Sequence, residues 1–162
     1  MAAAVSNTLH ILDINACKNN SSSSDNISTR TINTTHNRNI TSIDWSPDGT
    51  FLVASSDDMV SVYETQHWKQ IAFQAAQNKI YGCTFVQTRD KASNGRLSVA
   101  YGEYETICLW QFTASGSSPK HVSSAQSGMV VGFASVLRPD GQTLVASASH
   151  SKTKNLMIWT IV

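Results

Sequence analysis

The stretch THNRNITSIDWSPDGTFLVASSDDMVSVY, Thr35–Tyr63, decides the fold class of this chain of 162 residues. It contains three short runs rich in alternating or β-branched residues, Ile40–Trp45, Thr50–Ser56 and Val60–Glu64. Alternation places successive side chains on opposite faces of a strand. Between the first two runs lies SPDG, in which proline presets one backbone angle and glycine accepts a positive φ. The stretch therefore predicts three consecutive strands joined by tight turns.

Segments similar to the last of these strands recur along the whole chain. They are LHIL, VSVY, ICLW and LMIW, which end at residues 12, 63, 110 and 159, at intervals of 51, 47 and 49 residues. The SPDG turn also returns, as RPDG at Arg138–Gly141. A period slightly above 40–45 residues is typical of the four-stranded blades of a β-propeller.

The repeat predicts an all-β fold, a partial β-propeller of about three and a half four-stranded antiparallel blades. We expect half a blade at 1–14, a low-complexity polar loop at 15–26, and blades at 27–66, 67–114 and 115–162. Three and a half blades fall short of the four that ring closure needs. We therefore expect a fragment of a longer protein or a truncated product that is marginally stable alone. Assembly of copies into a closed ring is the alternative.

The composition excludes several classes of partner. The formal net charge is +1 and charged residues make up 14%, which predicts no direct binding of nucleic acid or of an anionic membrane. The sequence shows neither a signal peptide nor an apolar run of about 20 residues. Three cysteines are too few and too scattered for a disulfide framework or a zinc site. A protein of the nucleus or the cytoplasm fits these observations.

The Thr35–Tyr63 stretch resembles a WD repeat, with a His before the inner strand, then W-S-P-D-G, A-S-S-D-D and a closing aromatic. In that family a loop His, a strand Ser, a turn Asp and the closing Trp form a buried hydrogen-bonded set that rigidifies the blade. The resemblance implies this role for His36, Ser56, Asp58 and Tyr63, with Tyr in place of Trp.

The two later units match the WD pattern less closely. Gln77 and Gln126 stand where the His would be, and the turn His150–Asn155 is long and basic. We expect these two blades to lack the hydrogen-bonded set and to rely on apolar packing between sheets.

A narrower resemblance concerns ITSIDW…FLVASSDDMVSVY, NKIYGCTF and LVASASHSK, in this order. These stretches are similar to the C-terminal blades of LEUNIG-type plant transcriptional corepressors, which belong to the Groucho/TUP1 class. The resemblance implies a nuclear, non-catalytic protein–protein interaction scaffold whose partners are transcription factors or other corepressor subunits. A WD-repeat adaptor in another pathway, such as substrate recognition by a ubiquitin ligase or trafficking, is the alternative function, and the cytoplasm is the alternative location.

No motif in the sequence predicts catalysis, a metal site, a cofactor or a small-molecule substrate. There is no phosphate-binding glycine loop, no G-x-S-x-G, no H-E-x-x-H and no C-x-x-C. Binding is expected instead at the loops on one rim of the propeller. The residues that we expect to contact acidic or phosphorylated partners are Arg38, Tyr104, His150, Lys152 and Lys154.

Overall fold

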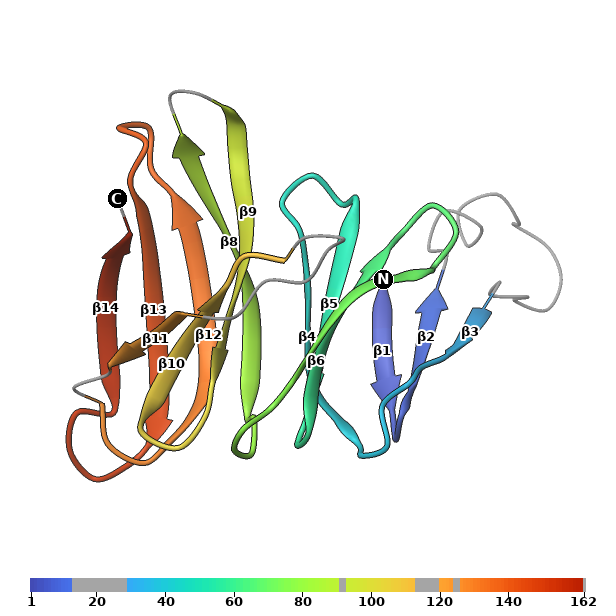
Figure 1. The fold of residues 1–162 in the computed structure, drawn as a ribbon, viewed down its shortest axis with the longest axis horizontal. Coiled ribbons are helices and arrows are strands. Elements are labelled where there is room, and N and C mark those ends of the chain that lie inside the picture. Colours follow the sequence, from blue (N-terminus) through green and yellow to red (C-terminus); the bar gives the residue numbers. More distant parts are fainter. Residues whose placement is uncertain (13–28, 91–92, 113–119, 124–125, 162) are drawn as a thin grey trace, which may run out of the picture.

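The structure, a computed structural model, describes residues 1–12, 29–90, 93–112, 120–123 and 126–161 (Figure 1). These residues form fourteen strands, and the expected all-β fold is confirmed. Within these ranges there is no helix that could cross a membrane. The loop predicted at 15–26 and the last two residues of the half blade predicted at 1–14 lie outside the described residues.

The strands form four antiparallel sheets that stand side by side in a row (Figure 1). The first sheet contains β1 (Ala2–Val5), β2 (Thr8–Leu12) and β3 (Thr29–Asn33). The second contains β4 (Ile40–Trp45), β5 (Phe51–Ser56), β6 (Met59–Glu64) and β7 (Gln70–Ala75). The third contains β8 (Gly82–Asp90), β9 (Ser93–Gly102), β10 (Thr106–Trp110) and β11 (Lys120–Ser123). The fourth contains β12 (Met129–Leu137), β13 (Thr143–His150) and β14 (Leu156–Ile161).

The sheets differ from the predicted sequence units by one strand. The strand that opens each unit pairs with the sheet before it: β3 pairs with β2, β7 with β6 and β11 with β10. The unit predicted at 27–66 is therefore divided between the first and second sheets. The physical reason is that a strand following a closing strand continues the antiparallel meander beside it. The chain crosses to the next sheet only afterwards.

The two Pro-Asp-Gly turns form as their sequences predict. Gly49 has a φ of 72° and Gly141 a φ of 88°. The amide of Gly49 donates to the carbonyl of Ser46 at 2.9 Å, and the amide of Gly141 donates to that of Arg138 at the same distance. Only glycine adopts these backbone angles without strain, so both turns are determined by the local sequence.

The core lies between the sheets, because each sheet covers the face of its neighbour. The largest cluster joins the second and third sheets and includes Val53, Val62, Phe85 and Trp110, all buried. Leu9 and Leu52 belong to the cluster between the first and second sheets, and a third cluster joins the third and fourth. Apolar residues on both faces of a strand, as in FLVASS, reflect this stacking.

Candidate functional site

Loops from all four sheets meet at one end of the molecule, the lower end in Figure 1, and we call this end the rim. It consists of residues 34–39, 57–58, 76–81, 103–105, 126–128 and 151–155. Backbone bonds join neighbouring loops: the amide of Ile80 donates to the carbonyl of Asp57 at 3.1 Å, and that of Glu105 donates to Gly128 at 2.8 Å. The rim is therefore a continuous surface that crosses all the sheets.

The structure brings together four of the five predicted binding residues. Tyr104 forms a β-bridge with Met129, and Met129 pairs with His150 on its other side. Lys152 and Lys154 follow in the turn directly after β13, where both are exposed and neither forms an ion pair with a described residue. Tyr104 is 59% exposed. The result is one basic patch with an exposed aromatic ring beside it.

The fifth predicted residue, Arg38, lies apart from this basic patch. It is exposed and lines a hollow of about 390 Å³ with Asn37, Asn39, Thr41 and Asp57. The rim residues Arg38 on one side and Lys152 and Lys154 on the other, none of which forms an ion pair with a described residue, therefore define two cationic positions rather than a single basic surface.

Acidic groups occupy the middle of the rim, between these two positions. Asp57 forms an ion pair of 3.0 Å with Lys79, whose ammonium group lies 5.8 Å from the centre of the Tyr81 ring. Glu103, which is buried, accepts a hydrogen bond from the Asn78 amide at 3.1 Å. Asn78, rather than the neighbouring Gln77 that the sequence pattern indicated, makes this contact.

Behind the loop that carries Arg38 lies a hydrogen-bonded chain of His36, Ser56 and Asp58. The distance from His36 Nδ1 to Ser56 Oγ is 2.6 Å, and Ser56 Oγ donates to Asp58 Oδ1, also at 2.6 Å. Because the Ser56 proton goes to the carboxylate, His36 Nδ1 must be the donor to Ser56. This assigns the neutral tautomer with a bare Nε2, a buried atom that has no hydrogen-bond partner among the described residues. Burial lowers the pKa of His36 from 6.5 to about 4, although the Asp58 charge opposes the shift.

Tyr63, the fourth residue expected in this set, is not part of the chain. Its hydroxyl donates to Gln70 Oε1 at 3.4 Å. The strand register explains the separation: Tyr63 pairs with Leu52, and Ser56 lies four residues further along β5. The position two residues beyond Leu52, within reach of the ring, is Ala54, which has no hydroxyl.

The fourth sheet contains a hydrogen-bonded set where the sequence predicted none. Trp159 Nε1 donates to Ser147 Oγ at 2.8 Å, and Ser147 Oγ donates to Gln126 Oε1 at 2.7 Å. Gln126 Nε2 donates back to the Ser147 carbonyl at 3.0 Å. Trp159 pairs with Val145, so Ser147 occupies the position that Ala54 holds in the second sheet. The expectation of purely apolar packing in this unit was wrong, because an amide both accepts and donates as the imidazole would.

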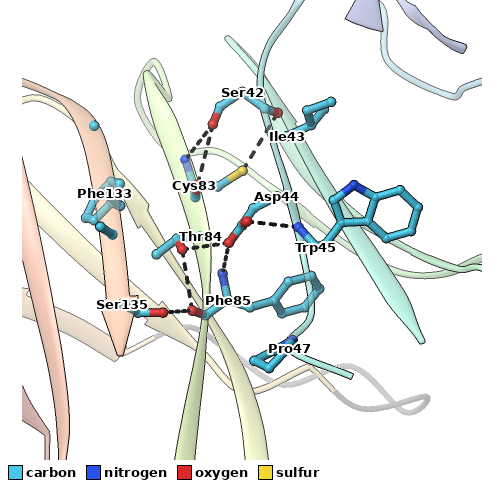
Figure 2. Close-up of a pocket in the computed structure, with 12 residues that line it drawn as sticks. Ser42, Ile43, Asp44, Trp45, Pro47, Cys83, Thr84, Phe85, Phe133 and Ser135 are labelled. Carbon is cyan, nitrogen blue, oxygen red and sulfur yellow. Dashed lines mark hydrogen bonds between the residues drawn. The ribbon is translucent and has the colours of Figure 1, made fainter. Parts of the chain in front are cut away.

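A hollow of about 470 Å³ lies against the inner strands β4, β8 and β12, and Figure 2 shows Asp44 in its wall. Asp44 Oδ2 accepts hydrogen bonds from Thr84 Oγ1 at 2.7 Å and from the Phe85 amide at 2.9 Å. Its Oδ1 accepts one from the Trp45 amide at 2.9 Å. The carboxylate therefore ties the second sheet to the third. The only sign of this contact between sheets in the sequence was the acidic residue among the apolar positions of ITSIDW.

The described residues provide little for catalysis. Within the described ranges, no group of three or more His, Cys, Asp or Glu side chains could hold a metal ion. Cys83 and Cys108 are buried, and burial raises the pKa of each thiol to about 11. Both thiols are thus protonated at neutral pH and are poor nucleophiles.

Comparison with known proteins agrees with this architecture. Residues 26–64 match the family model described as WD domain, G-beta repeat. A chain of the crystal structure of a mitotic checkpoint complex aligns with 99% of this chain at a TM-score of 0.63 and 17% identity. Saccharomyces cerevisiae Sqt1 aligns with 99% at a TM-score of 0.64 and 14% identity, and U3-55K with 98% at 0.66 and 10%. No curated protein matches the sequence.

These results show that the chain shares its fold with β-propeller proteins. It contains a WD repeat at residues 26–64 and has the propeller fold over almost its whole length. It spans 45%, 40% and 47% of the three matched chains, in the order given above. A WD domain of this kind indicates a scaffold for protein–protein interaction.

Proposed function

We propose that this chain binds other proteins through its rim, as a subunit of a nuclear transcriptional corepressor. The observation that carries the proposal is the basic patch of His150, Lys152 and Lys154 beside the exposed ring of Tyr104. Exposed ammonium groups that form no ion pair with a described residue can pair with carboxylates or phosphates of a partner. An exposed tyrosine adds apolar contact area at a low cost in side-chain entropy.

The rim favours a partner that carries negative charge at separate places. Arg38 lines a hollow together with Asp57, and the Asp57–Lys79 ion pair and the buried Glu103 lie between Arg38 and the lysines of the basic patch. Because Lys79 is already paired, an acidic or phosphorylated segment finds its partners at Lys152 and Lys154 rather than at the centre of the rim.

The assignment to a corepressor is supported by the resemblance of ITSIDW…FLVASSDDMVSVY, NKIYGCTF and LVASASHSK to the LEUNIG-type proteins. Transcription factors or other corepressor subunits would then be the partners, and the nucleus the place of binding. This step rests on the sequence alone, because a fold does not specify which proteins it binds.

The test is affinity capture from nuclear and cytoplasmic extracts with three baits, followed by identification of the captured proteins by mass spectrometry. The baits are the wild-type chain, the Lys152→Glu/Lys154→Glu double variant and Lys69→Glu. Lys69 is exposed at the opposite end of the second sheet, so it controls for charge reversal away from the rim.

We expect the double variant to lose a set of nuclear proteins that Lys69→Glu retains, with DNA-binding transcription factors among them. Equal capture by all three baits would refute binding at the basic patch. Ubiquitin-ligase or coat subunits in the captured set would keep the scaffold function and refute the corepressor assignment.

A further inference from the structure

The hollow of about 470 Å³ against β4, β8 and β12 contains no residue of the rim. It follows the part of β4 that leads away from the rim, from Ser42 to Pro47 of the first Pro-Asp-Gly turn. Its volume is within the range of sites that hold a ligand or a side chain of a partner. The polar groups of its wall therefore indicate what kind of group it can take.

The wall of this hollow carries one charge, that of Asp44, which is partly exposed. Asp44 forms no ion pair with a described residue. A carboxylate has about four positions at which it can accept a hydrogen bond. The Trp45 amide, the Thr84 hydroxyl and the Phe85 amide occupy three of them. The wall thus presents a negative charge that can accept at least one further donor.

The hydroxyl groups of the wall already donate their protons within the wall. Ser42 Oγ donates to the Cys83 carbonyl at 3.4 Å and accepts from the Cys83 amide at 3.3 Å. Ser135 Oγ donates to the Phe85 carbonyl at 2.5 Å, and the Thr84 hydroxyl donates to the carboxylate. These hydroxyl groups therefore offer lone pairs rather than protons to a molecule in the hollow. Such a wall suits a group that is rich in donors.

Two partly exposed aromatic residues line the hollow as well. Figure 2 shows Phe133 of β12 on one side of Asp44 and Trp45 of β4 on the other. The face of an aromatic ring attracts a cation, and a planar guanidinium group can also stack on it. Ile43 and Ala134 add apolar area, on which the methylene groups of a long cationic side chain can lie.

We propose that this hollow binds an arginine side chain of a partner protein, with Asp44 as its counter-charge. A guanidinium group has five N–H donors and no acceptor, which complements a carboxylate and hydroxyl lone pairs. A lysine ammonium group is more strongly hydrated and does not stack, so it gains less from the aromatic residues. The hollow selects positive charge, whereas the basic patch of the rim selects negative charge. The two sites are thus independent of each other.

The test titrates the isotope-labelled full chain with the peptide acetyl-Gly-Arg-Gly-amide and follows its amide signals by NMR. Two further peptides carry citrulline, which has the shape of arginine without the charge, or lysine in the middle position. We expect the signals of Thr84, Phe133 and their neighbours to shift. We expect the arginine peptide to bind about tenfold more tightly than the citrulline peptide, which loses the hydrogen bond between charged groups.

Asp44→Asn removes the charge of the hollow and should weaken binding of the arginine peptide by about tenfold. Asp140→Asn is the matched control, because Asp140 is exposed, pairs with Arg138 and lies outside the hollow. If circular dichroism shows that Asp44→Asn unfolds, Ala134→Lys decides the question. Ala134 is exposed at the hollow, and a lysine there supplies a competing ammonium group. Ala134→Gln is its uncharged control and should retain binding.

Several results would overturn the proposal. They are equal affinity for the arginine and citrulline peptides, affinity for the lysine peptide as high as for arginine, and shifts confined to the rim. Unchanged affinity in a folded Asp44→Asn or in Ala134→Lys would overturn it too. The same holds for a loss in Asp140→Asn or Ala134→Gln as large as in the charged counterparts.

Discussion

The buried imidazole of His36 makes the stability of the fold depend on pH in a calculable way. Burial lowers its pKa from 6.5 to about 4, and its Nε2 has no hydrogen-bond partner in the part of the chain that the structure describes. Protonation would therefore place a charged N–H in a site without an acceptor. In the unfolded chain, the same imidazole is hydrated and takes up a proton near pH 6.5.

The sign and size of the effect follow from these two pKa values. Below pH 6.5 the unfolded state binds a proton that the folded state does not, so the free energy of unfolding falls as the pH falls. The free energy of unfolding therefore keeps its full value with respect to His36 above pH 6.5. It falls between pH 6.5 and about 4, and His36 lowers it no further below that pH. From pH 7 to pH 4.5 the linkage relation gives a loss of about 2 kcal/mol from this group.

Urea unfolding followed by circular dichroism at several pH values measures this loss, with His36→Gln as the matched variant. Gln126 shows that a glutamine is accommodated in a hydrogen-bonded set at the equivalent place of the fourth sheet. We expect the wild type to lose about 2 kcal/mol more than His36→Gln between pH 7 and pH 4.5, since carboxylates contribute to both. Equal pH dependence of the two proteins would refute the buried neutral imidazole.

Three further predictions use the same unfolding measurement. Gly102→Ala should lower the free energy of unfolding by about 3 kcal/mol, because a Cβ would lie 2.3 Å from a carbonyl oxygen of the fourth sheet. Gly132→Ala is the control: its Cβ would have its nearest contact at 3.7 Å, so the free energy of unfolding should change by about 1 kcal/mol at most. Ser147→Ala should cost about 1–3 kcal/mol by unpairing an indole N–H and an amide oxygen. Ser61→Ala should be near neutral, because it removes a buried hydroxyl that has no hydrogen-bond partner among the described residues. Asp44→Asn should cost about 1–3 kcal/mol, since it weakens three hydrogen bonds to a carboxylate; an unchanged midpoint would contradict the role of this residue in joining two sheets.

The sequence predicts the fold because its repeat and its turns are local features. The spacing of LHIL, VSVY, ICLW and LMIW locates β2, β6, β10 and β14, and the two Pro-Asp-Gly turns locate the hairpins that precede β5 and β13. The assignment of opening strands to sheets was wrong by one strand. Periodicity places a strand in the chain, but only hydrogen bonding shows which neighbour it joins.

The hydrogen-bonded sets were harder to predict, because they depend on register. Ser56 and Ser147 occur in similar motifs, ASS and ASA. Ser147 lies two residues beyond Val145, the strand partner of Trp159, whereas Ser56 lies four residues beyond Leu52, the strand partner of Tyr63. A shift of two residues along one strand keeps a side chain on the same face and moves it by one step of the pleat. Motif matching cannot detect such a shift. The shift nevertheless decides which hydroxyl group an indole or a phenol ring reaches.

The two sets stand directly behind the two cationic positions of the rim, which connects the fold to the proposed binding. His36, Ser56 and Asp58 fix the ends of the loop at 34–39 and of the turn at 57–58, beneath Arg38. In the fourth sheet Gln126 Nε2 also lies 3.4 Å from the carbonyl of Asn155, which holds the turn that carries both lysines. A loop that is already ordered loses less conformational entropy when a partner binds. If the rim binds as proposed, Gln126→Ala should therefore weaken binding at the basic patch, although Gln126 is buried and touches no partner.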